Sequence, residues 1–363
     1  MARRRIVSLW VASVVFTIAL VSPGVTTSLP GGDADGLRVT DYFLSHTSNE
    51  PFYRQQKLDS RVILHMREVV LSGRERTVSA DGWELLLIHG GTFPGYVTFD
   101  TNYANVSQMR HFARSGWDTF ALDLEGYCLS TRPMIMDAPT AFPESKAPMH
   151  GEFTVRNIER AVDFIRTLRG VEKVHLLGWS LGADLEVPRY AIQKPGKDAS
   201  LVFYGVGYDG PMSMDRRRER AVLDEAAKVL YSRPCSSSRR AGLGTKKEFI
   251  VPGAFEAFRT AHLASDPKSA ELGGAVRWPA GRSVDLDLSK PFFDASKIRV
   301  PTLVIGGEAD TWATCESNRL LVESLGREIE EYVEIPGGGH FLHFEKTNDI
   351  FYRAVINCLE ANN

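Results

Sequence analysis

The chain has 363 residues, of which 43% are hydrophobic and 24% charged, and its formal net charge is −2. This is ordinary globular composition, and the length suits one large α/β domain with an insertion, or two domains. A core of this size needs no disulfide or metal to hold it together. The near-neutral charge gives no indication of a nucleic-acid partner, so we expect a protein that does not bind DNA or RNA.

The N-terminus has the layout of a secretory signal peptide. Three arginines at positions 3–5 form a basic head, an apolar run covers residues 6–21, and small residues follow it. The apolar run is shorter than the roughly 20 residues that a transmembrane helix needs. We therefore predict a signal peptide over residues 1–28 and a secreted or periplasmic mature protein, with an uncleaved membrane anchor as the alternative.

Apolar segments at regular intervals predict an α/β core. The first is expected to be an antiparallel strand and the others to be strands buried on both faces. These segments are residues 61–70, 83–88, 117–124, 174–177 and 201–206. Amphipathic helices are expected at residues 103–115 and 154–168, closed by Gly116 and Gly170. Repeated βα units imply a mostly parallel central sheet flanked by helices.

The α/β pattern breaks between residues 210 and 297. This segment lacks short apolar strands, carries an arginine-rich stretch at residues 216–220 that we interpret as a solvated face, and has a helical pattern near residues 255–263. The pattern resumes with a strand at 300–305, a helix at 315–325, a strand at 331–335 and a helix at 344–359. We therefore expect a core made of residues 36–209 and 298–363, with 210–297 inserted as a mainly helical cap.

The cysteines give little guidance. Four occur, far apart in the sequence: Cys128, Cys235, Cys315 and Cys358. In an exported protein an even number permits two disulfides, for which three pairings are open. No two cysteines form a CxxC pair, so the sequence carries no metal-site signature. We expect no metal and no organic cofactor.

The strongest chemical signal is the sequence Gly-Trp-Ser-Leu-Gly at residues 178–182. It follows an expected buried strand and precedes an expected helix, which is the context of a nucleophile elbow. In such a turn the serine has a strained backbone, and the flanking glycines remove side chains that would clash. The hydroxyl of Ser180 is then presented at the positive end of a helix, where an oxyanion can form. We predict that Ser180 is a nucleophile.

A serine hydroxyl needs a base to activate it and a carboxylate to orient that base. His340 follows an expected strand and three glycines, a loop that can carry an imidazole over the sheet edge. His343 is the alternative base. Asp310, after the strand at 300–305, is the expected carboxylate, because the order Ser180, Asp310, His340 is a known chain order of nucleophile, acid and histidine. Any acid at a strand end could also reach this site. Glu308 and Asp209 are the alternatives to Asp310.

The oxyanion must be held by backbone amides. One is expected from Leu181, directly after the nucleophile. The other is expected from Gly91, in the His-Gly-Gly turn that follows the strand at 83–88. A glycine at this position allows the substrate to approach the backbone closely. We therefore predict that Gly91 and Leu181 form an oxyanion hole.

Taken together, these segments resemble the α/β-hydrolase superfamily, in its branch of cap-bearing esterases, lactonases, peptidases and epoxide-hydrolase relatives. The resemblance runs from about residue 85 to the C-terminus without the insertion. The matching segments are LIHGG at 87–91, DLEG at 123–126, GWSLG at 178–182, PTLVIGGEAD at 301–310 and GHFLHFE at 339–345. It implies a triad of Ser180, Asp310 and His340. A serine nucleophile argues against the dehalogenases and true epoxide hydrolases of this superfamily.

Two departures from the family pattern bear on the site. The turn after Asp123 lacks the usual GxGxS pattern and has Gly-Tyr-Cys-Leu-Ser at residues 126–130. The helix after the nucleophile carries Asp184 and Glu186, which would weaken oxyanion stabilisation if they faced the site. The expected reaction is nevertheless two-step acyl transfer to water on a small ester-like substrate.

Several alternatives stay open. Lactone, amide and carbon–carbon cleavage use the same machinery, and a non-catalytic ligand-binding protein on this fold would be expected to lack a triad member. The insertion is expected to roof the pocket and set specificity without being needed for the chemistry. Candidate pocket residues, each of which could instead pack the insertion itself, are Tyr208, Met212, Phe255, Phe258 and Trp278. The sequence assigns neither substrate-binding residues nor an oligomeric state.

Overall fold

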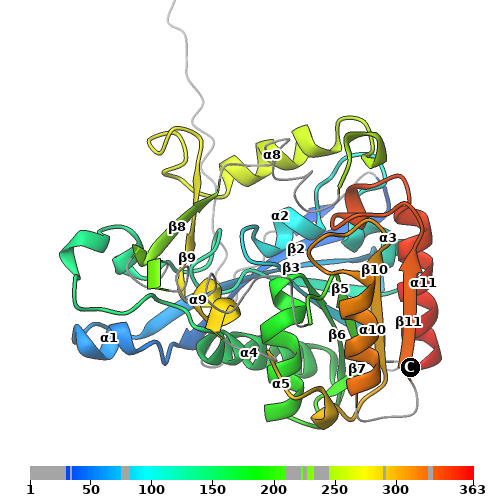
Figure 1. Ribbon diagram of the computed structural model, residues 1–363, viewed down its shortest axis with the longest axis horizontal. Coiled ribbons are helices and arrows are strands. Elements are labelled where there is room, and N and C mark those ends of the chain that lie inside the picture. The colour runs from blue at the N-terminus through cyan, green and yellow to red at the C-terminus, as the bar shows by residue number, and fades with distance from the viewer. Residues whose placement is uncertain are drawn as a thin grey trace, which may run out of the picture.

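A nine-stranded sheet forms the centre of the protein (Figure 1). The computed structural model describes residues 30–32, 35–74, 82–208, 222–223, 227–232, 245–288, 292–325 and 330–363. The predicted signal peptide, the arginine-rich stretch, Asp209, Met212 and Cys235 lie outside these residues. Among the helices within them, none is long and apolar enough to span a membrane.

The strand order in the sheet is β1-β2-β3-β5-β4-β6-β7-β10-β11. The strands are β1 (Pro30–Gly32), β2 (Leu37–Thr47), β3 (Arg61–Leu71), β4 (Glu84–Ile88), β5 (Asp118–Leu122), β6 (Val174–Trp179), β7 (Asp198–Tyr204), β10 (Thr302–Gly307) and β11 (Glu330–Ile335). The pairs from β1 to β5 are antiparallel. The pairs from β5 to β11 are all parallel. The predicted mostly parallel sheet is thus confirmed.

Helices cover both faces of this sheet, as the apolar runs of the central strands require. They are α2 (Gly95–Phe99), α3 (Gln108–Arg114), α4 (Gly151–Arg169), α5 (Val187–Gln193), α10 (Cys315–Ser324) and α11 (Asn348–Ala361). The short helix α1 (Pro51–Gln55) packs in a separate small cluster with Ile135 and Met136. Alternate residues of β4 join different cores: Leu86 packs in the core with α4 and α5, whereas Leu87 packs in the core with α3 and α11. This alternation follows from the two-residue repeat of a strand.

The predicted helices are present, with shifted ends. Helix α4 ends at Gly170, which has φ +72° and donates its N–H to Arg166 O, a position that favours glycine. The helix predicted from residue 103 begins only at Gln108, because the hydroxyl of Ser107 accepts a hydrogen bond from the N–H of Arg110 and caps it there.

The described part of the insertion contains helices, as the sequence predicts, and also strands that it does not predict. The helices are α8 (Ala254–Ala264) and α9 (Gly281–Leu288), and the strands form a two-stranded antiparallel sheet of β8 (Val229–Ser232) and β9 (Val276–Pro279). Helix α8 contacts α2, and α9 contacts α4. In Figure 1 α8 lies at the top of the view, and β8, β9 and α9 lie to the left of it and below it.

Candidate active site

Ser180 occupies a strained turn between β6 and the helical turn Gly182–Glu186 that leads into α5. Its φ is +52°, in the left-handed region that few side chains adopt. A Cβ on Gly178 would lie 2.8 Å from the backbone nitrogen of Ala183, and one on Gly182 would lie 2.6 Å from the oxygen of Ile88. The two glycines of the motif are therefore required for the chain to turn this tightly.

The three residues of the predicted triad lie in one hydrogen-bonded chain. The Nε2 atom of His340 is 3.0 Å from Ser180 Oγ, and its Nδ1 atom is 2.7 Å from Asp310 Oδ2. His340 and Asp310 are buried, at 2% and 4% exposure. Because the Asp310 carboxylate accepts the proton on Nδ1, Nε2 is left as the acceptor that faces the Ser180 hydroxyl.

Asp310 is itself held in place by backbone donors. Its Oδ1 accepts hydrogen bonds from the N–H groups of Trp312, at 2.9 Å, and Ala313, at 3.0 Å. One carboxylate oxygen thus anchors the acid to the turn after β10, and the other faces the imidazole. The backbone of the turn after β10 therefore holds Asp310, and Asp310 in turn orients the imidazole of His340.

The backbone of His340 is fixed by residues that the sequence did not single out. Its N–H donates to Thr245 Oγ1 at 3.1 Å, and its carbonyl accepts from Trp179 Nε1 and from the Tyr204 hydroxyl, both at 3.2 Å. Thr245 also donates to Glu345, which accepts the N–H of Gly339 at 2.7 Å. A residue of the insertion therefore supports the histidine loop.

The alternative residues have other partners. His343 is fully buried with Nδ1 2.9 Å from the Tyr204 hydroxyl, and burial, followed by the nearby His340, lowers the pKa of His343 to about 3. Glu308 accepts the N–H of Gly337 at 2.8 Å. The geometry favours His340 and Asp310 over both of these, and Asp209 lies outside the described residues.

The predicted oxyanion turn lies directly against Ser180. A Cβ on Gly90 would be 3.1 Å from Ser180 Cβ, and one on Gly91 would be 3.2 Å from Leu181 Cδ2. His89 is fully buried, and burial, followed by the charge of Arg282, lowers its pKa to about 3. Its neutral ring accepts the N–H of Leu124 at Nε2 and therefore donates from Nδ1 to Gly90 O at 2.7 Å.

The two acidic residues after the nucleophile have partners of their own. Asp184 is fully buried, accepts the N–H of Gly207 at 2.7 Å, and burial raises its pKa well above the ordinary value. Both oxygens of Glu186 accept from Arg282 of α9, at 2.6 Å from Nε and 3.0 Å from Nη2. Sequence reasoning noticed these acids but missed the arginine that pairs with one of them.

Aromatic residues of α8 pack beside the site. The ring centroid of Phe258 lies 5.0 Å from that of Phe93, and Phe93 stacks on Trp179, the residue before Ser180. The ring centroid of Phe255 lies 5.4 Å from that of Phe341, the residue after His340. These two candidate pocket residues therefore contact the core. The other described candidates, Tyr208 and Trp278, are buried in the core that contains α4 and α5.

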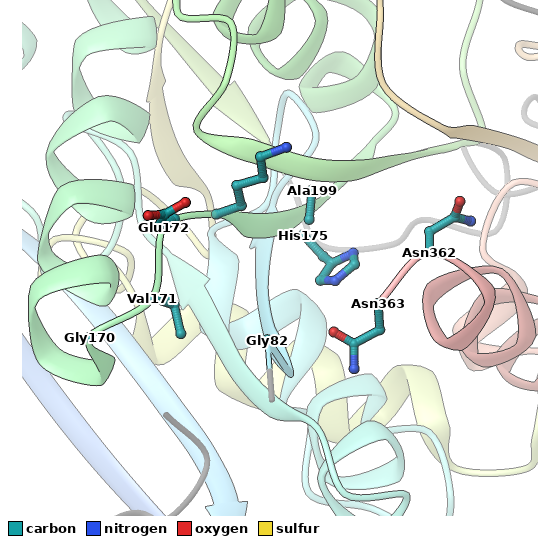
Figure 2. Close-up of a pocket in the computed structure, with 9 residues that line it drawn as sticks. Gly82, Gly170, Val171, Glu172, His175, Ala199, Asn362 and Asn363 are labelled. Atoms are coloured by element: carbon teal, nitrogen blue, oxygen red, sulfur yellow. The ribbon is translucent and has the colours of Figure 1, made fainter. Parts of the chain in front are cut away.

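The described cysteines and one further pocket are not part of the hydrogen-bonded chain from Ser180 to Asp310. Cys128, Cys315 and Cys358 are free thiols, and within the described residues no three His, Cys, Asp or Glu side chains are grouped to hold a metal ion. Figure 2 shows a pocket of about 370 Å³ near His175 and Asn363. It lies at the amino ends of the parallel strands, whereas Ser180 lies at their carboxyl ends, so we assign it no part in the chemistry.

Comparison with known proteins gave a consistent picture. A family model described as alpha/beta hydrolase fold matches residues 85–347. A sequence search of curated proteins gave no match. Similar solved structures include an esterase from Thermogutta terrifontis, with TM-score 0.57 and 15% identity over 88% of this chain and 98% of the esterase. An enol-lactonase from Burkholderia xenovorans has TM-score 0.54 and 16% identity over 82% of this chain and 97% of the lactonase. A monoacylglycerol lipase from Paleococcus ferrophilus has TM-score 0.53 and 20% identity over 77% of this chain and 94% of the lipase. At these identities the similarity shows the fold.

Proposed function

The chain belongs to the α/β-hydrolase fold family, and from that premise we propose that it is a serine hydrolase. It cleaves a carboxylic ester or a related acyl bond of a small molecule through an acyl-enzyme intermediate. The observation that carries this proposal is the hydrogen-bonded chain from Ser180 Oγ to His340 to Asp310, with distances of 3.0 and 2.7 Å. This is the arrangement that activates a serine hydroxyl.

In the first step Ser180 Oγ attacks the substrate carbonyl while His340 Nε2 takes its proton. Asp310 stabilises the imidazolium that forms. The carbonyl oxygen becomes an oxyanion, which the N–H groups of Gly91 and Leu181 bind; one such donor typically contributes about 10²- to 10³-fold in rate. His340 then protonates the leaving group, activates a water molecule, and the second attack releases the acid and restores Ser180.

A non-catalytic ligand-binding role is the alternative from another class. It is less well supported, because a binding protein has no need to keep a nucleophile, a base and an acid within hydrogen-bond distance of one another. The bond that is cleaved is a separate matter. Esters, lactones, amides and activated carbon–carbon bonds all pass through attack on a carbonyl, so the triad does not choose among them.

A fluorophosphonate probe tests the proposal without knowledge of the substrate. An activated serine attacks the phosphorus and forms a stable adduct, so we expect one probe per chain on the peptide that contains Ser180. A panel of p-nitrophenyl esters of increasing acyl length should then show turnover with at least one chain length. A folded protein that neither takes up the probe nor hydrolyses any ester would contradict the proposal and favour the binding role.

We also propose that residues 1–28 direct export and that the mature protein is secreted or periplasmic. The basic head and short apolar run support this. Protein recovered from its native host should begin between about residues 25 and 35, as N-terminal sequencing would show. Recovery of the chain with its initiator methionine from the cytosol would contradict export.

A further inference from the structure

Arg282, in the first turn of α9, has a fully buried side chain. A buried charge must be paired and hydrogen-bonded, because removing it from water costs several kcal/mol. The guanidinium meets this requirement through a two-point contact with Glu186. Glu186 belongs to the turn that follows Ser180, so the pair joins α9 directly to the nucleophile elbow.

The remaining donors of Arg282 point at the oxyanion turn. Nη2 donates to the carbonyl of His89 at 3.1 Å, and Nη1 donates to the carbonyl of Gly90 at 3.0 Å. Nη1 also donates to the hydroxyl of Tyr127 at 3.0 Å, and that hydroxyl donates to the carbonyl of Gly91 at 2.5 Å. Three consecutive carbonyls of the turn are therefore bound by one network.

The direction of these carbonyls fixes the direction of the amides. In a planar trans peptide the C=O of one residue and the N–H of the next point to opposite sides. Because the Gly90 carbonyl faces Arg282, the N–H of Gly91 faces away from it. Gly90 itself lies against Ser180, with its would-be Cβ 3.1 Å from Ser180 Cβ. The guanidinium, together with the His89 Nδ1–H that donates to the same Gly90 carbonyl at 2.7 Å, thus sets the direction of the predicted oxyanion donor.

Contacts on either side of Arg282 hold the first turn of α9 in place. The N–H of Gly281 donates to Pro148 O at 3.0 Å, and a Cβ on Gly281 would lie 2.5 Å from that oxygen. One helical turn on, Asp285 Oδ2 accepts the N–H of Gly151 at 2.6 Å, at the start of α4. The first turn of α9 is therefore held against the core on both sides of Arg282.

We propose that Arg282 is a positioning residue for the oxyanion hole, acting through the carbonyls of the His89-Gly90-Gly91 turn and assisted by Tyr127. The inference rests on the proposed serine-hydrolase function and deepens it. It also departs from the expectation that the insertion serves specificity alone, because the insertion supplies a group that orients part of the catalytic machinery.

The rival explanation is that Arg282 only neutralises Glu186 and stabilises the fold. Arg169 provides a matched control for that role. It is also buried, and it pairs with Asp118, at 2.6 Å, and with Glu68 near the amino ends of the parallel strands, away from Ser180. Loss of a buried ion pair should lower stability in both cases. Only loss of Arg282 should impair the binding of an oxyanion.

The test compares Arg282→Met, Arg282→Lys and Tyr127→Phe with Arg169→Met. For each, kcat and KM on the best ester of the panel are measured together with the affinity for a trifluoromethyl ketone, which forms a tetrahedral oxyanion adduct with Ser180. We expect Arg282→Met to lose about 10²-fold in kcat with little change in KM, and to lose ketone affinity by a similar factor. Arg282→Lys, which keeps the charge but not the planar fork, and Tyr127→Phe should each lose about tenfold.

Arg169→Met should lower the thermal unfolding midpoint while its folded fraction keeps kcat within about twofold of wild type. The inference is overturned if the Arg282 and Tyr127 variants retain kcat and ketone affinity while only their stability falls. If Arg282→Met does not fold, Tyr127→Phe decides by the same two readouts. If the wild type itself shows neither turnover nor probe labelling, the proposed function fails. That outcome differs from an active wild type whose Arg282 and Tyr127 variants are unimpaired, which overturns only the role of Arg282.

Discussion

Ser180→Ala is expected to lower kcat by about 10⁶-fold, because no other group takes the place of the nucleophile and the triad acts as a unit. The fold should be kept. Alanine retains the Cβ of serine and suffers the same positive φ of +52°, so the strain of the elbow does not change. The measurement is ester hydrolysis, with the unfolding midpoint and fluorophosphonate labelling recorded on the same preparation.

Ser200→Ala is the matched control for this variant. Ser200 Oγ also contacts a histidine, lying 2.7 Å from the Nδ1 atom of His175. His175 lines the pocket of Figure 2, near the amino ends of the strands. Removal of the Ser200 hydroxyl should leave kcat within about twofold of the wild-type value, because a single hydrogen bond far from the active site contributes to stability and not to the reaction. Turnover that survives in Ser180→Ala at the wild-type level would exclude the serine mechanism.

The nucleophile turn was predictable because its requirements are local. A buried strand and two glycines flanking a serine are visible in the sequence at residues 174–182, and the structure gives Ser180 the positive φ that this pattern predicts. His340 and Asp310 were predictable for a related reason: each follows a strand of a parallel sheet, and the carboxyl ends of such strands meet at one edge. The positions of these residues directly after predicted strands were therefore enough to predict that they meet.

Arg282 could not be found in this way. It lies 192 positions from Gly90, which its guanidinium contacts, and the chain has 43 lysines and arginines from which to choose. Arginine is also a residue type that is expected at the surface. The one indirect signal was Glu186, because an acid that must be buried beside a nucleophile implies a buried cation, without saying which. Thr245 carried no signal at all.

The missed strands have similar physical causes. Strand β2 was not predicted because much of it is only half buried and its sequence is mixed, with charged residues among apolar ones. Strand β9 has four residues, one of them Arg277, whose charge is compensated by Asp266 at 2.6 Å. A short strand with a buried ion pair lacks both the length and the alternation that identify strands in a sequence.

The two histidines after the glycine loop give a second prediction of large effect. His340→Asn is expected to lower kcat by about 10⁶-fold, comparable to the serine variant, because triad members act together. Asparagine keeps an amide near the Nδ1 position, where it can still donate to Asp310, but it has no counterpart of Nε2, the atom that lies 3.0 Å from Ser180 Oγ. The substitution therefore removes the base with little disturbance of its support.

His343→Asn is the matched comparison. His343 uses Nδ1, 2.9 Å from the Tyr204 hydroxyl, and with its pKa lowered to about 3 it stays neutral at the pH of an esterase assay. Asparagine can preserve that contact, so the expected cost is stability, on the order of 1–3 kcal/mol for a changed buried side chain, with kcat of the folded protein largely kept. Both variants are assayed for kcat and for thermal unfolding. The base would have to be reassigned if His343→Asn, although folded, lost turnover by the larger factor and His340→Asn did not.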